Sequence, residues 1–81
     1  MTQAIETRVR SIVARVAKLD GDGAALNADA DLFRELGVES TAALDLLLSL
    51  EEEFGVSIDD QAFGDSRTVN ALAALVGKLL A

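Results

Sequence analysis

Apolar residues recur every three or four positions in three segments of this chain, and this spacing restricts how the chain can fold. In the first segment the recurring residues are Ile5, Val9, Ile12, Val13 and Val16. Such spacing places side chains on one face of an α-helix, whereas a half-buried strand needs apolar residues at every second position, a pattern that no segment sustains. Because each helix must bury its apolar face against another element, the sequence predicts an all-α fold.

Two later segments carry the same spacing. Their apolar faces consist of Ala43, Leu46, Leu47, Leu50 and Phe54, and of Val69, Leu72, Leu75, Val76 and Leu79. We expect the earlier helix to run from about Ser40 to Phe54 and to end at Gly55. Ser40 or Glu39 is expected to cap its start, and Thr68 to cap the start of the last helix.

A long connection separates the first two helices. Gly21 and Gly23 break the first helical pattern, and residues 20–38 follow without a sustained periodicity. Within this segment we expect a short helical turn over residues 31–36. Several apolar residues predict that the loop packs onto the core, namely Leu26, Leu32, Phe33, Leu36 and Val38. Loops this long in small domains are often functional.

A shorter helix is expected before the last one. Residues 56–58 read as a brief extended piece, Asp59 or Asp60 can begin a helix that reaches Phe63, and residues 64–66 read as a turn. The sequence therefore predicts a small antiparallel four-helix bundle, with three main helices, a short third helix and a long loop between the first and second.

The size and composition of the chain exclude several functions. Its 81 residues make a single domain, residues 1–81, with little material for a deep active site. The chain has neither cysteine nor histidine, which excludes a disulfide framework, a thiolate zinc site and a Ser-His catalytic pair. The Asp20–Gly23 run lacks the later ligands of an EF-hand calcium loop. We expect no catalytic residue and no metal site.

The charge is distributed unevenly. The net charge is −7, and residues 19–66 hold thirteen acidic residues against one base, Arg34. This anionic field would repel nucleic-acid phosphates and attract basic protein surfaces. No apolar run approaches membrane-spanning length, and the first residues lack the basic and apolar regions of a signal peptide. We therefore expect a cytoplasmic protein that binds neither nucleic acid nor membrane.

The second helix carries two leucines outside its core-facing stripe. At about 100° per residue, Leu44 and Leu48 point to a flank of the helix. Their neighbours on that flank are Thr41, Asp45, Glu51 and Glu52. An apolar centre with an acidic edge is typical of a protein-binding surface. The alternative is that the long loop covers both leucines.

Ser40 stands at the start of this helix and has three possible roles. It can be a simple N-cap, which is a common role for serine. It can be a nucleophile, but no histidine is present and neither lysine belongs to a supporting motif. It can also be a site of covalent modification by a phosphate-bearing group, which a helix N-terminus favours and the nearby Glu39 and Asp45 oppose.

Around Ser40 the chain resembles the acyl carrier proteins. The resemblance covers nearly the whole chain and is most specific over residues 32–58. It is carried by the runs Leu32-Phe33-x-x-Leu36-Gly37-Val38-Glu39-Ser40 and Leu50-Glu51-Glu52-Glu53-Phe54-Gly55-Val56. The family consists of small acidic four-helix bundles that are usually monomers, and it implies the same helices that the periodicity predicts.

The resemblance implies that Ser40 carries a 4′-phosphopantetheine arm, which a phosphopantetheinyl transferase attaches from coenzyme A. The thiol of the arm would hold acyl intermediates of fatty-acid, polyketide or related biosynthesis as thioesters, and the chain itself would not be an enzyme. The implied partners are this transferase and acyl- or aminoacyl-loading ligases or synthases with basic surfaces. The implied partner-binding residues are Glu39, Thr41, Leu44, Asp45, Leu48, Glu51 and Glu52.

The chain departs from the family pattern beside the serine. Glu39 and Thr41 stand where the family usually has Asp and Leu, Ala42 stands where fatty-acid carriers commonly have an acid, and Asp59 stands where they often have proline. These departures favour a specialised carrier over a housekeeping fatty-acid carrier. An aminoacyl carrier loaded by a dedicated ligase, and an acidic helical interaction domain that is never modified, are the alternatives.

Overall fold

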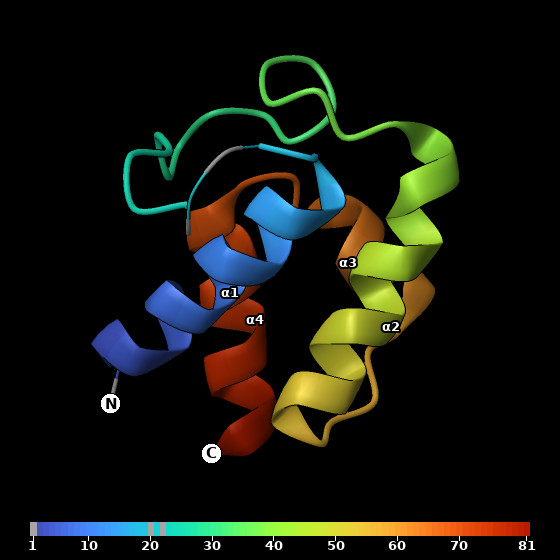
Figure 1. Ribbon diagram of the computed structural model, residues 1–81. Coiled ribbons are helices and arrows are strands. Elements are labelled where there is room, and N and C mark those ends of the chain that lie inside the picture. Colours follow the sequence, from blue (N-terminus) through green and yellow to red (C-terminus); the bar gives the residue numbers. More distant parts are fainter. Residues whose placement is uncertain (1, 20, 22) are drawn as a thin grey trace.

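A computed structural model of the chain describes residues 2–19, 21 and 23–81. It contains α1 over Thr2–Val16, the short 3₁₀ helix η1 over Ser40–Ala42, α2 over Ala43–Phe54, α3 over Asp60–Asp65 and α4 over Val69–Leu80. In Figure 1, α1 runs in the opposite direction to both α2 and α4. The described residues form no strand, so the predicted all-α four-helix bundle is confirmed.

The core lies where the three long helices meet. α1 contacts both α4 and α2, and the side chains between them are aliphatic apart from Phe54. The largest fully enclosed side chains are Val9, Val13, Leu32, Leu46, Leu50, Val69, Leu72 and Val76. Leu79, which the periodicity placed on the buried stripe of α4, is 41% exposed.

Three of the expected helix boundaries are confirmed by their hydrogen bonds. Gly55 adopts the left-handed conformation (φ 65°), and its N–H donates to the carbonyl of Glu51. The side chain of Asp59 caps α3, and the hydroxyl of Thr68 accepts from the N–H of Ala71 at 3.0 Å to cap α4. Local sequence identified these ends because each capping group lies within a few residues of its partner.

Two other boundaries differ from expectation. The start of the second helix is a 3₁₀ turn, and neither Ser40 nor Glu39 makes a side-chain cap there. Residues 64–65 belong to α3 rather than to a turn. The short helical turn expected over residues 31–36 is confirmed, because the carbonyl of Asp31 accepts from the N–H groups of Glu35 and Leu36.

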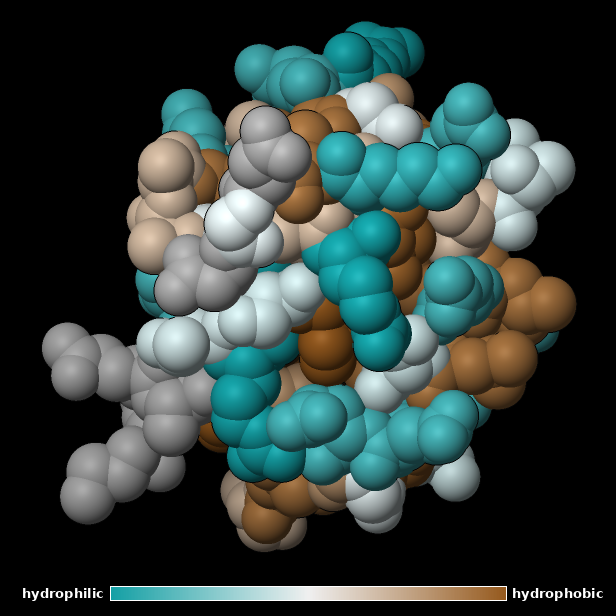
Figure 2. Space-filling model, viewed as in Figure 1, coloured by the Kyte–Doolittle hydropathy of each residue, from teal (hydrophilic) through white to brown (hydrophobic). Residues whose placement is uncertain are grey.

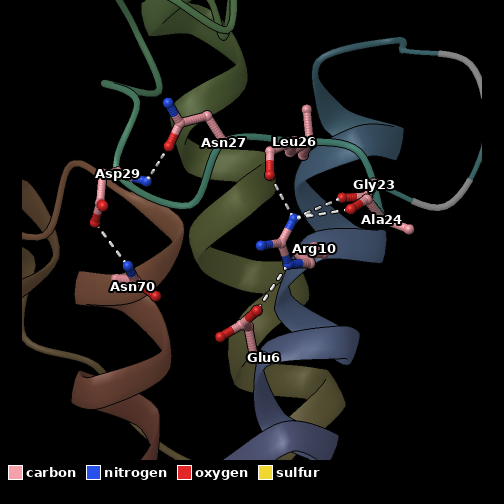
Figure 3. A network of polar contacts seen from close by, with 8 residues as sticks. All are labelled: Glu6, Arg10, Gly23, Ala24, Leu26, Asn27, Asp29 and Asn70. Atoms are coloured by element: carbon pink, nitrogen blue, oxygen red, sulfur yellow. Dashed lines mark hydrogen bonds and ion pairs between the residues drawn. The ribbon is translucent and has the colours of Figure 1, made fainter.

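Arg10 of α1 holds the beginning of the long loop (Figure 3). Its Nε donates to Glu6, and its Nη1 donates to the carbonyls of Gly23 at 3.0 Å and Leu26 at 2.6 Å. Gly23 lies so close to α1 that a Cβ added there would be 2.4 Å from the carbonyl oxygen of Arg10. The loop can therefore cross the helix at this point only with a glycine.

The later part of the loop is bound to the start of α4. The N–H of Leu32 donates to the carbonyl of Arg67 at 2.8 Å, and the N–H of Asn70 donates to the carbonyl of Ala28 at 3.1 Å. The side-chain amide of Asn70 also donates to Asp29 at 2.7 Å, as Figure 3 shows. These bonds fix the path of the chain up to the residues that precede Ser40.

Candidate functional site

Ser40 is exposed at the start of η1, where the loop joins α2. Val38 is buried and anchors the preceding chain, while Glu39 is extended (φ −76°, ψ 151°). The carbonyl of Glu39 accepts from the N–H of Ala42, which closes the 3₁₀ turn. Within the described residues the hydroxyl of Ser40 makes no hydrogen bond, so it is available to a reagent from solvent.

An open hollow of about 880 Å³ begins beside Ser40. It lies between the end of the loop, the first turn of α2, and the segment from α3 to α4. Its lining is mainly apolar, with half-buried Phe33 and Phe63 and one cation among its members. The lining residues are Phe33, Gly37, Val38, Glu39, Ser40, Ala43, Phe63, Gly64 and Arg67.

The cation of the hollow, Arg67, is held from two sides. Its Nε and Nη2 donate to the carboxylate of Asp31 at 2.8 and 3.2 Å, and its guanidinium lies 4.8 Å from the ring centre of Phe33. Asp31 also accepts from the N–H groups of Phe33 and Arg34, each at 2.9 Å. The hydrogen bonds from Arg67 and from the backbone of Arg34 hold the pKa of Asp31 well below its usual range.

The outer face of α2 presents the two displaced leucines to solvent. Leu44 is 62% exposed and Leu48 is 48% exposed, so the loop does not cover them and that alternative is wrong. Figure 2 shows hydrophobic surface beside hydrophilic side chains on the side of the molecule where α2 lies. Thr41, one turn before Leu44, is also exposed.

The acidic residues around these leucines differ in their internal contacts. Asp45 accepts from the hydroxyl of Ser49 at 3.2 Å, and that hydroxyl accepts from Arg15 of α1 at 2.7 Å. Glu51 is half-buried, and its Oε2 accepts from the backbone N–H of Ile58 at 2.8 Å. Glu51 therefore also supports the turn after α2.

Glu52 and Glu53 follow Glu51 on the surface. Glu53 pairs with Arg8 of α1 at 2.8 Å, and the guanidinium of Arg8 also lies 4.4 Å from the ring centre of Phe54. Glu52 is exposed and has no ion-pair partner among the described residues. The carboxylates available to a partner are therefore those of Glu39, Asp45 and Glu52, together with the outer oxygen of Glu51.

The structure brings the predicted residues onto one side of α2 and adds one that the sequence did not single out. Ser40, Glu39 and Thr41 lie at the start of η1, and the leucines and acids follow along α2. Arg67 was missed because it lies 36 positions from its partner Asp31. No local pattern marks a contact across that separation.

The structure also bears on metal sites and on membrane-spanning helices. Among the described residues, no three acidic side chains are grouped so as to hold a metal ion. Asp20 and Asp22 of the rejected calcium-loop motif lie outside the described residues. No helix of residues 2–19, 21 and 23–81 combines the length and apolar character that crossing a membrane requires.

The chain matches a protein-family model and several curated proteins. Residues 7–76 match the model described as a phosphopantetheine attachment site. The acyl carrier protein of Thermotoga maritima is 32% identical over 78 residues, covering 96% of this chain and 94% of that protein. Acyl carrier protein 2 of Pseudomonas aeruginosa is 41% identical over 56 residues, covering 69% and 68%. The acyl carrier protein of Phaeodactylum tricornutum is 36% identical over 63 residues, covering 78% and 80%.

Proposed function

Because the chain belongs to the acyl carrier protein family, we propose that Ser40 is the residue that carries its 4′-phosphopantetheine arm. A member of this family is a carrier that uses a phosphopantetheine cofactor and is not itself an enzyme. We propose below where the arm is attached, which cargo it carries and which enzymes bind the chain.

The exposed and unbonded hydroxyl of Ser40 is the observation that carries this proposal. A serine that capped α2 would have to give up a hydrogen bond to become modified, and among the described residues Ser40 makes none. A transferase would join this hydroxyl to the phosphate of the pantetheine arm and break the phosphoanhydride bond of coenzyme A. Adenosine 3′,5′-bisphosphate would leave, and the hydroxyl proton would pass to a base of the transferase. No base within the chain is needed, because the transferase supplies the catalytic groups.

We also propose that the outer face of α2 docks the transferase and the enzymes that load and use the arm. Leu44 and Leu48 supply an apolar centre. Asp45 and Glu52 supply negative charge beside it, where basic partner residues would speed encounter and fix orientation. Since the face begins at Ser40, a partner bound there is also next to the proposed attachment site. Glu39, Thr41 and Glu51 are the remaining proposed contacts.

Intact-mass measurement tests the attachment site. The purified chain is incubated with coenzyme A and a broad-specificity phosphopantetheinyl transferase, and we expect a mass gain of one phosphopantetheinyl group. Ser40→Ala should show no gain, whereas Ser57→Ala, an exposed serine away from the hollow, should gain the group normally. A gain that persists in Ser40→Ala would place the arm elsewhere.

The cargo is proposed as an acyl thioester, and the departures from the family pattern at Glu39, Thr41 and Ala42 favour a specialised carrier. An aminoacyl cargo is the second candidate, and Glu39 beside the attachment site suits its ammonium group. Mass measurement of the species isolated from the native host separates the two. We also propose that the carrier is a monomer and that it acts in the cytoplasm. One relative, from Hordeum vulgare, is instead named as chloroplastic.

A further inference from the structure

The hollow beside Ser40 is not a uniform apolar groove. Phe33 and Phe63 provide half-buried rings, but Arg67 places a guanidinium among them, with its side chain 46% exposed. A group tethered to Ser40 by a flexible arm can fold back into this space. The hollow therefore favours cargo that satisfies both the rings and the cation.

The guanidinium of Arg67 has donor capacity left. Nε and Nη2 are used by Asp31, while Nη1 makes no hydrogen bond to any described residue. An alkyl chain lying over Nη1 would displace its water and offer no acceptor in return, which is unfavourable. A cargo with an oxygen acceptor would replace the lost water.

The charges around the hollow determine whether a charged or a neutral cargo oxygen is the better acceptor for Arg67. Asp31 already neutralises Arg67, and Glu39 contributes a further negative charge to the lining. The phosphodiester of an arm on Ser40 would add another. A carboxylate cargo would face this excess of negative charge, whereas a neutral carbonyl or hydroxyl oxygen would accept from Nη1 without electrostatic cost.

We propose that Arg67 is a specificity-determining residue that makes the hollow favour acyl groups with a neutral oxygen, such as 3-oxo or 3-hydroxy groups, over plain alkyl groups of the same length. This rests on the proposed function of Ser40. It concerns the cargo that the carrier shelters, and the carrier performs no chemistry on it.

The test compares two cargoes of equal length. The ¹⁵N-labelled chain is loaded from hexanoyl- and 3-oxohexanoyl-coenzyme A by the transferase, and shifts are measured relative to the unacylated holo form at the amides of Phe33, Gly64 and Ser66 and at Arg67 Nε–H. We expect about threefold to tenfold larger shifts for 3-oxohexanoyl, as one hydrogen bond to a half-exposed cation permits. Equal shifts for the two cargoes, or no shift for either, would overturn the proposal.

Three variants separate donor loss from structural damage. Arg67→Met removes every side-chain donor but keeps the backbone carbonyl that accepts from Leu32, and it should abolish the difference between cargoes. Asp31→Asn breaks the ion pair while retaining Arg67, so the difference should persist. Gly64→Leu should fill the hollow and abolish both sets of shifts, because a Cβ at Gly64 meets no atom within 4 Å.

The outcomes also distinguish this proposal from the one on which it rests. Failure of the wild-type chain to gain mass at Ser40 would overturn both. Normal loading with a cargo difference that survives in Arg67→Met would overturn only the role of Arg67. If attachment of the unacylated arm itself causes shifts that depend on Arg67, and adding either cargo changes nothing further, then Arg67 binds the arm rather than the cargo. That result would also overturn the role of Arg67.

Discussion

The loop over residues 23–38 and the outer face of α2, here Leu44, Asp45, Leu48 and Glu52, both carry polar groups at the surface. The two regions use these polar groups differently. Carbonyls and side chains of the loop bind Arg10 on one side and the start of α4 on the other. On α2, two leucines are open to solvent and Glu52 has no ion-pair partner among the described residues.

The polar groups of the loop stabilise the fold, whereas the open groups of the α2 face are available for function. Polar groups that bind within the chain fix its path, because a loop of this length loses considerable entropy on ordering and needs bonds to offset that loss. Groups left open contribute little to folding and remain available to partners. Substitutions in the loop should therefore change stability, and substitutions on the α2 face should change partner reactions.

The largest difference in stability is expected between substitutions of two leucines on opposite sides of α2. Leu46→Ala should lower the free energy of unfolding by about 2–5 kcal/mol, because Leu46 is fully buried in the core. Leu48→Ala should change it by less than about 0.5 kcal/mol. Urea denaturation measures both, and comparable losses would show that the α2 face is part of the folding core.

Substitution of two glycines in the loop region by alanine should lower stability by different amounts, although both glycines have φ 83°. Gly21→Ala should cost about 1 kcal/mol, since a Cβ there meets nothing within 4 Å and only the positive φ opposes it. Gly23→Ala should cost about 3 kcal/mol, because the Cβ also collides with the carbonyl of Arg10. Thermal unfolding of the two variants gives the comparison, and equal costs would mean that the close approach to α1 relaxes easily.

Charge on the α2 face should act on rate rather than on stability. Reversing Asp45 and Glu52 to lysine should slow transferase loading about tenfold at low ionic strength, with less effect at 0.5 M salt, where charges are screened. Reversing Asp60 and Asp65 makes the same change in net charge on α3, outside the α2 face, and serves as the control. A rate that falls equally in both double variants would point to net charge alone.

The smallest effect is expected for the ion pair between Asp31 and Arg67, which is partly exposed to solvent. The folded-state pKa of Asp31 lies below its ordinary value of 3.8. The charge of Asp31 therefore stabilises the folded state fully when the pH is above about 4, and this stabilisation is lost as the pH falls toward the folded-state pKa. Asp31→Asn keeps an oxygen for the N–H groups of Phe33 and Arg34. The variant should be less stable at pH 7, with a gap that narrows below about pH 4.

Titration of the unfolding free energy of both proteins over pH 2–7 measures this gap. A gap of constant size at every pH would mean that the charge of Asp31 does not contribute to stability.

Much of the fold could be predicted because its signals are local. The spacing of Val9, Val13, Leu46 and Leu50 set the buried faces, and Gly55, Asp59 and Thr68 set helix boundaries through bonds within a few residues. Their angle on the helix placed Leu44 and Leu48 outside the core stripe, but only the structure showed that the loop leaves them exposed. The N-cap expected of Ser40 did not form, because the chain enters α2 through a 3₁₀ turn closed by backbone atoms.

The sequence by itself determined that this chain is a helical bundle with a serine and two leucines outside the core stripe of an acidic helix. Only the tertiary structure decided that the hydroxyl of Ser40 is unbonded within the described residues, that Glu51 supports Ile58, and that Arg67 reaches the hollow beside Ser40. The physical reason is distance along the chain. Periodicity and caps depend on neighbours, whereas the contacts that shape the site join residues that only folding brings together.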